Sequence, residues 1–259
     1  MPSPAIELNR VSKSFGGRPA VDGVSLAIPE GQFMALVGRS GSGKTTTLKL
    51  IQRLIEPDAG EVRVLGRAPS DEPAPVWRRR LGYVLQDIGL FPHMSVAENI
   101  GVTPSLLGWP AADRAARTAE LLAMVGLDGS YAMRRPDQLS GGQRQRVGVA
   151  RALAARPPVL LMDEPFAALD PGTREALRDT CRTLHERLGL TSVLVTHDMT
   201  EAVLMADRIV VMGEGRILAD AGPAELMAGH PDPEVAALMA SPRRQAERLR
   251  ILLEGGRDG

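Results

Sequence analysis

The residues best suited to chemistry lie in a glycine-rich segment near the start of the chain. Residues 38–45 read GRSGSGKT, follow the apolar run Phe33 to Val37, and open a helical pattern at Lys44. This is the phosphate-loop pattern GxxxxGK[ST]. Its glycines let backbone N–H groups turn toward phosphate oxygens, its lysine neutralises phosphate charge, and its threonine offers a hydroxyl to Mg²⁺. The predicted phosphate cradle consists of Gly38, Ser40, Gly41, Ser42, Gly43, Lys44, Thr45 and Thr46, and Thr45 is also a predicted metal ligand.

A pair of carboxylates forms a second candidate group. Residues 159–164 read VLLMDE, which is an apolar strand that ends in Asp163 and Glu164. Because successive side chains on a strand point to opposite sides, the two carboxylates can take different tasks. We assign Asp163 to the metal and Glu164 to the attacking water. The alternative is a charged strand end that enters a loop.

A third group precedes an arginine- and alanine-rich helical pattern. Residues 139–143 read LSGGQ. Ser140 and the backbone amides that follow it begin this helix, and a helix N-terminus favours phosphate. The chain therefore carries two predicted anion sites.

These motifs resemble those of the ABC-type ATPases. They occur in the order typical of that family, and the resemblance extends over nearly the whole chain. LSGGQ is similar to the signature motif, Gln86 to the Q-loop glutamine, residues 168–170 to the D-loop, and His197 to the switch histidine. Phe15 stands where the family stacks an aromatic ring on adenine. The alternative for Phe15 is a core aromatic near a turn.

The resemblance implies ATP and Mg²⁺ as cofactors and a head-to-tail homodimer. In such a dimer the signature motif of one subunit closes over the ATP held by the phosphate loop of the other. Ser140, Gly141, Gly142, Gln143 and Asp170 then contact nucleotide. The implied catalytic residues are Glu164, which polarises the water, His197, which contacts the γ-phosphate, and Gln86, which senses that phosphate and ligates the metal.

The elements that must position these residues follow from the hydrophobic pattern. Strands are predicted at Ile6 to Val11, Val21 to Ile28, Phe33 to Val37, Glu61 to Leu65, 159–163, 191–197 and 208–212; helices are predicted from Lys44 to about Leu54, Asp113 to Val125, Gly142 to Ala154 and near Arg174 to Leu188. Alternation of strands and helices is typical of a parallel α/β sheet.

Together with the resemblance, this pattern predicts an α/β P-loop NTPase fold of the ABC ATPase type. We expect a RecA-like parallel-sheet core, an N-terminal antiparallel β subdomain, and an inserted α-helical subdomain at about 88–155. Residues 1–240 would form the nucleotide-binding domain, and 241–259 a C-terminal tail without CBS domains. That tail is expected to be a solvated helix that frays, and contact with a partner or anionic lipid is the alternative.

Composition argues against several functional classes. The chain has 31 Lys+Arg against 31 Asp+Glu, and only two Trp, two Tyr and four Phe, so nucleic acid is not an expected partner. The single cysteine, Cys181, cannot form an internal disulfide, and with His185 it supplies too few ligands for a metal site. Apolar runs are too short to span a membrane and the N-terminus lacks a signal pattern. We expect peripheral attachment to the cytoplasmic face of the inner membrane.

Two further stretches resemble the ATPases that import osmoprotectants such as glycine betaine, carnitine and choline. Residues 52–57 read QRLIEP and 83–94 read YVLQDIGLFPHM, although Gln52 and Asp87 depart from the residues that close relatives often carry. This resemblance implies integral-membrane permease subunits and an extracytoplasmic substrate-binding protein as partners. Ile88, Leu90, Phe91 and Met94 either grip the permease or form core. The alternatives are an importer of another small solute, such as an amino acid, and a soluble ABC ATPase outside transport.

Overall fold

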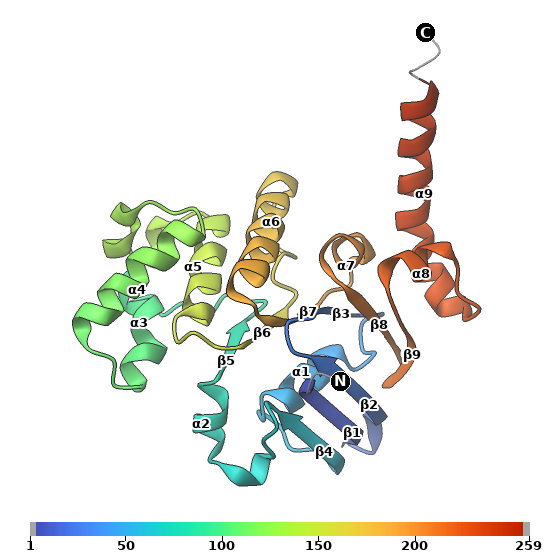
Figure 1. The fold of residues 1–259 in the computed structure, drawn as a ribbon, viewed down its shortest axis with the longest axis horizontal. Coiled ribbons are helices and arrows are strands. Elements are labelled where there is room, and N and C mark those ends of the chain that lie inside the picture. Colours follow the sequence, from blue (N-terminus) through green and yellow to red (C-terminus); the bar gives the residue numbers. More distant parts are fainter. Residues whose placement is uncertain (1–3, 256–259) are drawn as a thin grey trace.

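The computed structural model describes residues 4–255 and contains two β-sheets (Figure 1). The three-stranded sheet is antiparallel and has the order β2-β1-β4, while the six-stranded sheet has the order β5-β6-β7-β3-β8-β9 and is parallel except for β9. The strands are β1 Pro4–Phe15, β2 Arg18–Pro29, β3 Phe33–Val37, β4 Ala59–Val64, β5 Leu81–Val84, β6 Val159–Asp163, β7 Thr191–Val195, β8 Arg208–Gly213 and β9 Arg216–Ala221. The predicted α/β fold is confirmed.

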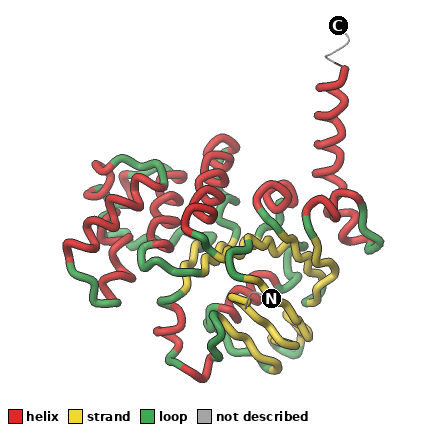
Figure 2. The backbone as a smooth tube through the Cα atoms, in the orientation of Figure 1, coloured by secondary structure: helices red, strands yellow, loops and turns green. Residues whose placement is uncertain are grey.

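The helices cover the six-stranded sheet and form a separate group at one side of it. They are α1 Lys44–Ile51, α2 Ala74–Arg78, α3 Val96–Leu106, α4 Ala111–Met124, α5 Gly141–Leu153, α6 Pro171–Leu188, α7 Met199–Met205, α8 Pro223–Ala228 and α9 Pro233–Gly255. Figure 2 shows the helices α3 to α5 grouped beyond the strands, and Figure 1 shows α9 leaving the body of the molecule.

The central strands are buried on both faces, which explains their continuous apolar sequence. Every residue of β3, β6 and β7 is buried. In β3, Phe33 and Val37 point into a core shared with the helices α5, α6 and α7, whereas Met34 and Leu36 point into a core shared with the antiparallel sheet and α1. The parallel sheet is therefore the middle layer between two hydrophobic cores.

The strand order fixes where the chemistry-bearing loops meet. β6, β7 and β3 are neighbours and parallel, so the loops after their carboxyl ends leave the same edge of the sheet. The phosphate loop follows β3, Glu164 follows β6, and His197 follows β7. In open α/β sheets, ligands bind outside the carboxyl ends of the strands.

Several element boundaries differ from those predicted. The first helix ends at Ile51, before the predicted Leu54, because Gln52 closes it and Arg53 turns to a φ of 55°. The helix predicted near Arg174 begins at Pro171, because Asp170 caps it. Helix α3 was not predicted, although Ser95 and Glu98 form the capping box that signals its start.

The predicted C-terminal tail is the later part of a longer helix. Helix α9 starts at Pro233, where the Asp232 side chain accepts hydrogen bonds from two backbone N–H groups, and it continues through Pro242. Residues 256–259 of the predicted tail lie outside the described residues.

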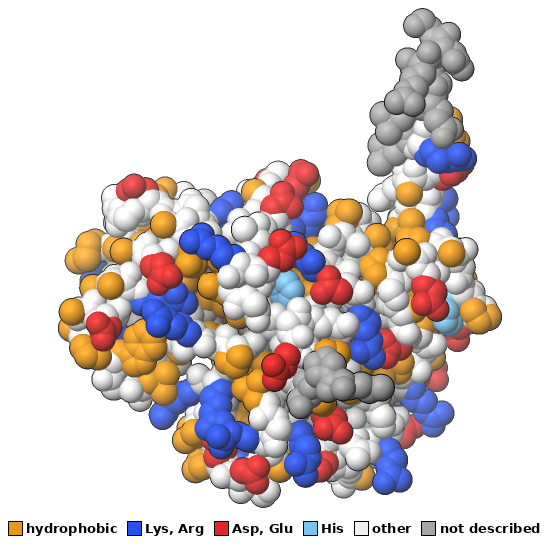
Figure 3. All heavy atoms as spheres, viewed as in Figure 1, with side chains coloured by type: hydrophobic (Ala, Val, Ile, Leu, Met, Phe, Trp, Pro, Cys, Tyr) orange, Lys and Arg blue, Asp and Glu red, His pale blue; other side chains and the backbone are white. Residues whose placement is uncertain are grey.

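Within residues 4–255, no helix has the length and apolar character needed to cross a membrane. On the face viewed in Figure 3, acidic and basic side chains are interspersed over the body.

A buried asparagine anchors the segment that leads into α3. Asn99 is fully buried; its Oδ1 accepts a hydrogen bond from the Phe91 N–H (2.8 Å), and its Nδ2 donates to the carbonyl oxygens of Phe91 (3.1 Å) and Met94 (3.2 Å). Asn99→Ala would leave these backbone groups without partners, so we expect it to lower the free energy of unfolding by about 2 kcal/mol. Chemical denaturation would measure the change, with the exposed Ser105→Ala on the same helix as control. A change equal to that of Ser105→Ala would contradict the anchoring role.

Candidate functional site

The phosphate loop adopts a conformation that only glycine permits at two positions. Gly38 has a φ of 147° and Gly43 a φ of 105°. A Cβ atom at Gly38 would clash with the Met212 carbonyl oxygen, and one at Gly43 with the Ala20 carbonyl oxygen. The loop therefore packs directly against β8 and β2. A side chain at either glycine would prevent this contact.

The Lys44 side chain is hydrogen-bonded to the backbone of the phosphate loop. Its Nζ donates hydrogen bonds to the carbonyl oxygens of Gly38 (2.8 Å) and Arg39 (2.9 Å), and only 6% of the residue is exposed. Burial lowers the pKa of Lys44 from its ordinary value, and the carboxylates of Glu164 and Asp163 oppose that shift. The result is a cation held at the position where an anionic ligand would lie.

Asp163 lies at the end of β6 against the first turn of α1. The Thr45 hydroxyl donates to Asp163 Oδ1 (3.1 Å), and the Tyr83 hydroxyl donates to Oδ2 (3.4 Å). Burial raises the pKa of Asp163, and it also raises the pKa of Tyr83, with the charge of Asp163 adding to that rise. Tyr83 was not predicted as part of this site, and its position in an ordinary strand gives no sequence signal.

The oxygen donors of Thr45 and Asp163 suit a hard divalent cation. Among residues 4–255 there is no cluster of three or more His, Cys, Asp or Glu side chains that could hold a metal by itself. A cation here would therefore need further oxygens from water and from the ligand that it accompanies. This is how Mg²⁺ is ordinarily bound beside phosphates.

Glu164 and His197 form a contact across the ends of β6 and β7. His197 Nδ1 lies 3.0 Å from Glu164 Oε2, and the Glu164 N–H donates to the Val195 carbonyl oxygen (2.9 Å). Glu164 has a φ of 45°, in the left-handed region that side chains other than glycine, asparagine and aspartate seldom adopt. That strained turn brings its carboxylate beside an imidazole, and a carboxylate and an imidazole can together orient and deprotonate water.

These groups open on one cavity of about 600 Å³. It is lined by Ala20, Ser40, Gly41, Gly43, Lys44, Thr45, Thr46, Gln86, Glu164 and His197. All of these except Ala20 were predicted. The structure thus brings together residues from the phosphate loop, from the segment after β5, and from the ends of β6 and β7.

The remaining predicted contact residues lie outside the lining of this cavity. Ser140 and Gln143 form a capping box at the start of α5, and Asp170 caps α6 by accepting a hydrogen bond from the Thr173 N–H (3.0 Å). Gly142 is packed so closely on Thr173 that a side chain there would clash with it. Phe15 is 51% exposed, so the alternative that it is a core aromatic is wrong.

The only cysteine and its neighbour His185 belong to the core. Cys181 is 1% exposed, and burial raises its pKa to about 12. His185 Nδ1 lies 3.0 Å from the Ser192 hydroxyl, and its ring meets Phe33 edge-on. These contacts account for both residues through packing.

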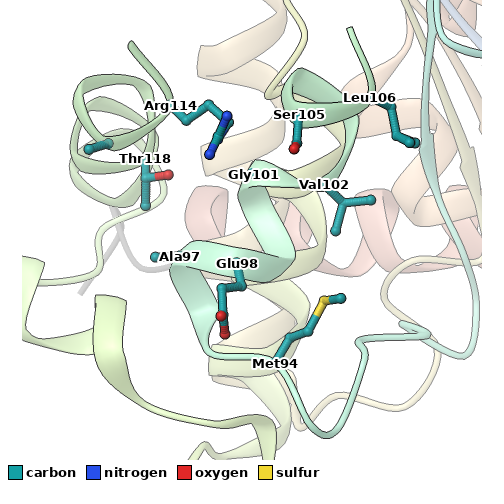
Figure 4. Close-up of a pocket in the computed structure, with 10 residues that line it drawn as sticks. Met94, Ala97, Glu98, Gly101, Val102, Ser105, Leu106, Arg114 and Thr118 are labelled. Carbon is teal, nitrogen blue, oxygen red and sulfur yellow. The ribbon is translucent and has the colours of Figure 1, made fainter. Parts of the chain in front are cut away.

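A second cavity, of about 460 Å³, is a mainly apolar groove between α3 and α4 (Figure 4). Figure 4 shows Arg114 reaching from α4 toward Ser105 of α3. The groove is lined by Met94, Ala97, Glu98, Gly101, Val102, Ser105, Leu106, Arg114, Ala115 and Thr118.

The apolar residues after Gln86 differ in burial. Leu90 is half-buried against the core, whereas Phe91 is 41% exposed and Met94 lines the groove. Arg151 of α5 donates to the carbonyl oxygens of Ile88 and Gly89 (2.6 Å each). The segment after the cavity residue Gln86 is thereby fastened to the helical group.

The sequence of this chain is similar to those of known proteins. Residues 21–167 match the family described as ABC transporter. The chain is 47% identical over 239 residues to the choline transport ATP-binding protein OpuBA of Bacillus subtilis (strain 168), a match that covers 92% of this chain and 63% of that protein. It is 51% identical over 222 residues to the glycine betaine uptake system ATP-binding protein YehX of Escherichia coli (strain K12), covering 86% and 72%. The chain thus spans less than two thirds of the length of OpuBA.

The fold also matches a solved assembly. The dimeric structure of MJ0796, a bacterial ABC transporter cassette, superposes with a TM-score of 0.77 at 35% identity, covering 84% of this chain and 98% of that chain. The similarity therefore extends over most of this chain.

The position of Lys44 leads to a binding prediction. Lys44→Ala removes the buried cation while leaving the glycine conformations of the loop in place, so we expect ATP to bind about tenfold or more weakly, as befits the loss of a charge-assisted hydrogen bond of about 1.5–3 kcal/mol. Isothermal titration calorimetry would measure it. Lys49→Ala, an exposed lysine on the same helix, is the control and should bind ATP normally. Unchanged affinity in Lys44→Ala would exclude the loop as the phosphate site.

Proposed function

Since this chain belongs to the ABC transporter family, we propose that it is the ATP-hydrolysing subunit of an importer for osmoprotectants of the quaternary-amine class, such as glycine betaine, carnitine and choline. The observation that carries the proposal is the single cavity in which the phosphate loop faces Glu164 and His197. The resemblance to choline and glycine betaine proteins supports the solute class.

The cavity residues, together with Asp163 beside them, divide the work of phosphoryl transfer to water. Lys44 and the backbone N–H groups of the loop bind the phosphates of ATP, and Thr45, Asp163 and Gln86 hold Mg²⁺, which neutralises charge on those phosphates. Glu164 accepts a proton from the attacking water. His197, held by Glu164 at 3.0 Å, contacts the γ-phosphate and keeps that water in line.

The predicted contact residues outside the cavity imply a second subunit. Ser140, Gly141, Gly142 and Gln143 begin α5, and Asp170 begins α6, on surfaces other than the cavity lining. In a head-to-tail homodimer these residues meet the ATP held by the other chain, and Phe15, whose ring is exposed, stacks on adenine. Similarity to a dimeric cassette supports this arrangement. Loss of the γ-phosphate then releases the two halves.

The groove between α3 and α4 supplies the contact with the membrane subunit. Its lining is mainly apolar, with Glu98 and Arg114 as charged members, and it adjoins the segment that Arg151 fastens beyond Gln86. A short helix of a permease seated there would be linked mechanically to the cavity. The ATPase would thereby lie on the cytoplasmic face of the inner membrane, in a complex completed by an extracytoplasmic substrate-binding protein.

The alternatives concern the solute and the presence of a transporter. Import of another small solute, such as an amino acid, would use the same cavity, because solute recognition belongs to other subunits. A soluble ABC ATPase would also use the cavity but would have no need of an apolar groove. Recovery of a permease with the chain from solubilised membranes separates the last case from the others.

Glu164 provides the test of hydrolysis. Glu164→Gln keeps the size of the side chain but removes the base, so we expect the steady-state ATPase rate to fall at least about 100-fold while ATP still binds and the dimer accumulates. Glu175→Gln, an exposed residue of α6, should hydrolyse ATP normally. Normal turnover in Glu164→Gln would remove Glu164 from the catalytic role.

Uptake of labelled glycine betaine and choline tests the solute class. A strain that carries Glu164→Gln in place of the normal chain should lose uptake, both at low and at high external osmolarity, because the assembled complex cannot turn over. The strain should lack its other quaternary-amine importers, so that the normal chain alone supports uptake. Absence of uptake with the normal chain would contradict the solute class and leave the ATPase assignment standing.

The groove provides a separate test of assembly. Ala115→Trp places a large ring inside the groove, whereas Ala116→Trp places the same ring outside its lining on the same exposed helix. We expect Ala115→Trp to reduce the permease recovered with the chain about tenfold, which a loss of about 1.4 kcal/mol in binding produces, and to leave ATP hydrolysis by the isolated chain unchanged. Equal recovery with both variants would place the permease contact elsewhere.

A further inference from the structure

One arginine touches two loops that belong to different parts of the site. Arg174 lies in the first turn of α6, after the cap residue Asp170. Its Nη2 donates a hydrogen bond to the carbonyl oxygen of Leu169 (3.2 Å), and its Nη1 lies 4.0 Å from Asp198 Oδ2. The guanidinium therefore stands between the segment 168–170 and the segment that carries His197.

The Asp198 side of this contact is built so that movement there reaches His197. Asp198 Oδ1 caps α7 by accepting hydrogen bonds from the N–H groups of Thr200 (2.8 Å) and Glu201 (3.3 Å), which leaves Oδ2 facing Arg174. The Asp198 N–H donates to the Thr196 hydroxyl oxygen (3.0 Å). His197 is thus held between two residues that are tied to each other.

Thr196 is in turn held by a hydrogen bond to a buried carboxyl group. Its hydroxyl donates to Glu201 Oε2 (2.6 Å), and Glu201 is 4% exposed. The pKa of Glu201 is raised, chiefly by burial and also by the charge of Asp198, and the Thr196 hydrogen bond and the charges of Arg174 and Arg178 oppose that shift. These hydrogen bonds make the loop around His197 rigid. The Oδ2 atom of Asp198 is the part of this loop that faces Arg174.

The guanidinium is only partly engaged in this state of the chain. Its Nε is buried and makes no hydrogen bond, and the separation of 4.0 Å from Asp198 is too long for one. Arg174 therefore has hydrogen-bonding capacity that its present contacts do not use, while its Nη2 is held by the Leu169 carbonyl group. The planar fork of an arginine can bond two acceptors at once, which lysine cannot do.

From these contacts we propose that Arg174 is a positioning residue that transmits the placement of residues 168–170 to His197. The inference rests on the proposed function, in which Asp170 meets the second subunit. When the second chain displaces the Leu169 carbonyl group, Arg174 closes on Asp198, and the rigid loop brings His197 into line with the γ-phosphate. Hydrolysis is thereby made to depend on the arrival of the partner.

Two substitutions isolate this connection in the full chain. Arg174→Gln keeps much of the length of the side chain but removes its charge and its two-pronged fork. Asp198→Asn keeps the helix cap, since asparagine caps as well as aspartate, and removes only the charge that faces Arg174. Arg187→Gln, at the exposed end of α6, is the matched control. Should Arg174→Gln fail to fold, Arg174→Lys keeps the charge and loses the fork.

The kinetic readout is a comparison of ATP affinity with turnover. We expect Arg174→Gln to lower kcat roughly tenfold, in keeping with the cost of misplacing a catalytic group by a fraction of an ångström, and to leave ATP affinity within about twofold of the normal chain. The double variant with Asp198→Asn should be no slower than the slower single variant. Full turnover in Arg174→Gln, or a double defect equal to the product of the single ones, would overturn the proposal.

A spectroscopic readout makes the test independent of ATPase activity. The ring resonances of His197, identified in ¹⁵N-histidine-labelled chain by comparison with His197→Ala, should shift in both single variants, whereas those of His230 should not. Unmoved His197 resonances would overturn the proposal even if turnover fell. A normal chain that hydrolyses no ATP at any protein concentration would instead overturn the proposed function, and the His197 resonances would still decide the role of Arg174.

Discussion

The pairing of β3, β6 and β7 as parallel neighbours is the constraint on which the site depends. Each strand is wholly buried, and their shared direction opens three loops on one edge of the sheet. The phosphate loop, Glu164 and His197 are far apart in the sequence and meet only there. Burial of apolar side chains on both faces stabilises this arrangement, since each buried methylene contributes about 0.8 kcal/mol. The chemistry is therefore carried by polar loops at the end of a hydrophobic scaffold.

The site itself is electrostatically costly. Burial lowers the pKa of Lys44 and raises that of Asp163, which means that water would hold each charge better than the protein does. Glu164 adds a left-handed backbone conformation. Such costs persist where the surrounding structure fixes them, and a ligand that carries several negative charges together with a cation would relieve the electrostatic part. The apolar layers on both faces of the sheet supply the stability that permits them.

The second half of the predicted site lies outside the cavity of the single chain. Ser140 and Asp170 are each used as helix caps in the isolated chain, at the start of α5 and α6, and both lie away from the cavity. Arg151 fastens the segment after Gln86 to α5, so the helical group and the cavity are joined through a few hydrogen bonds. These hydrogen bonds add to the hydrophobic core that the helices α3 to α5 share with the six-stranded sheet.

The sequence predicted every cavity residue except Ala20. The phosphate-loop residues and Glu164 follow from local patterns whose chemistry needs fixed neighbours, whereas Gln86 and His197 follow from the family resemblance. It also predicted the α/β fold from the apolar pattern of most strands, but it did not predict β9. It did not locate α3 and placed the end of α1 and the starts of α6 and α9 inaccurately, because capping contacts of single side chains decide such boundaries. Tertiary structure alone decided that Phe15 is exposed, that Tyr83 bonds Asp163, and that Arg174 lies between Leu169 and Asp198. These contacts join residues distant in sequence, and only the packing of the sheet brings them together.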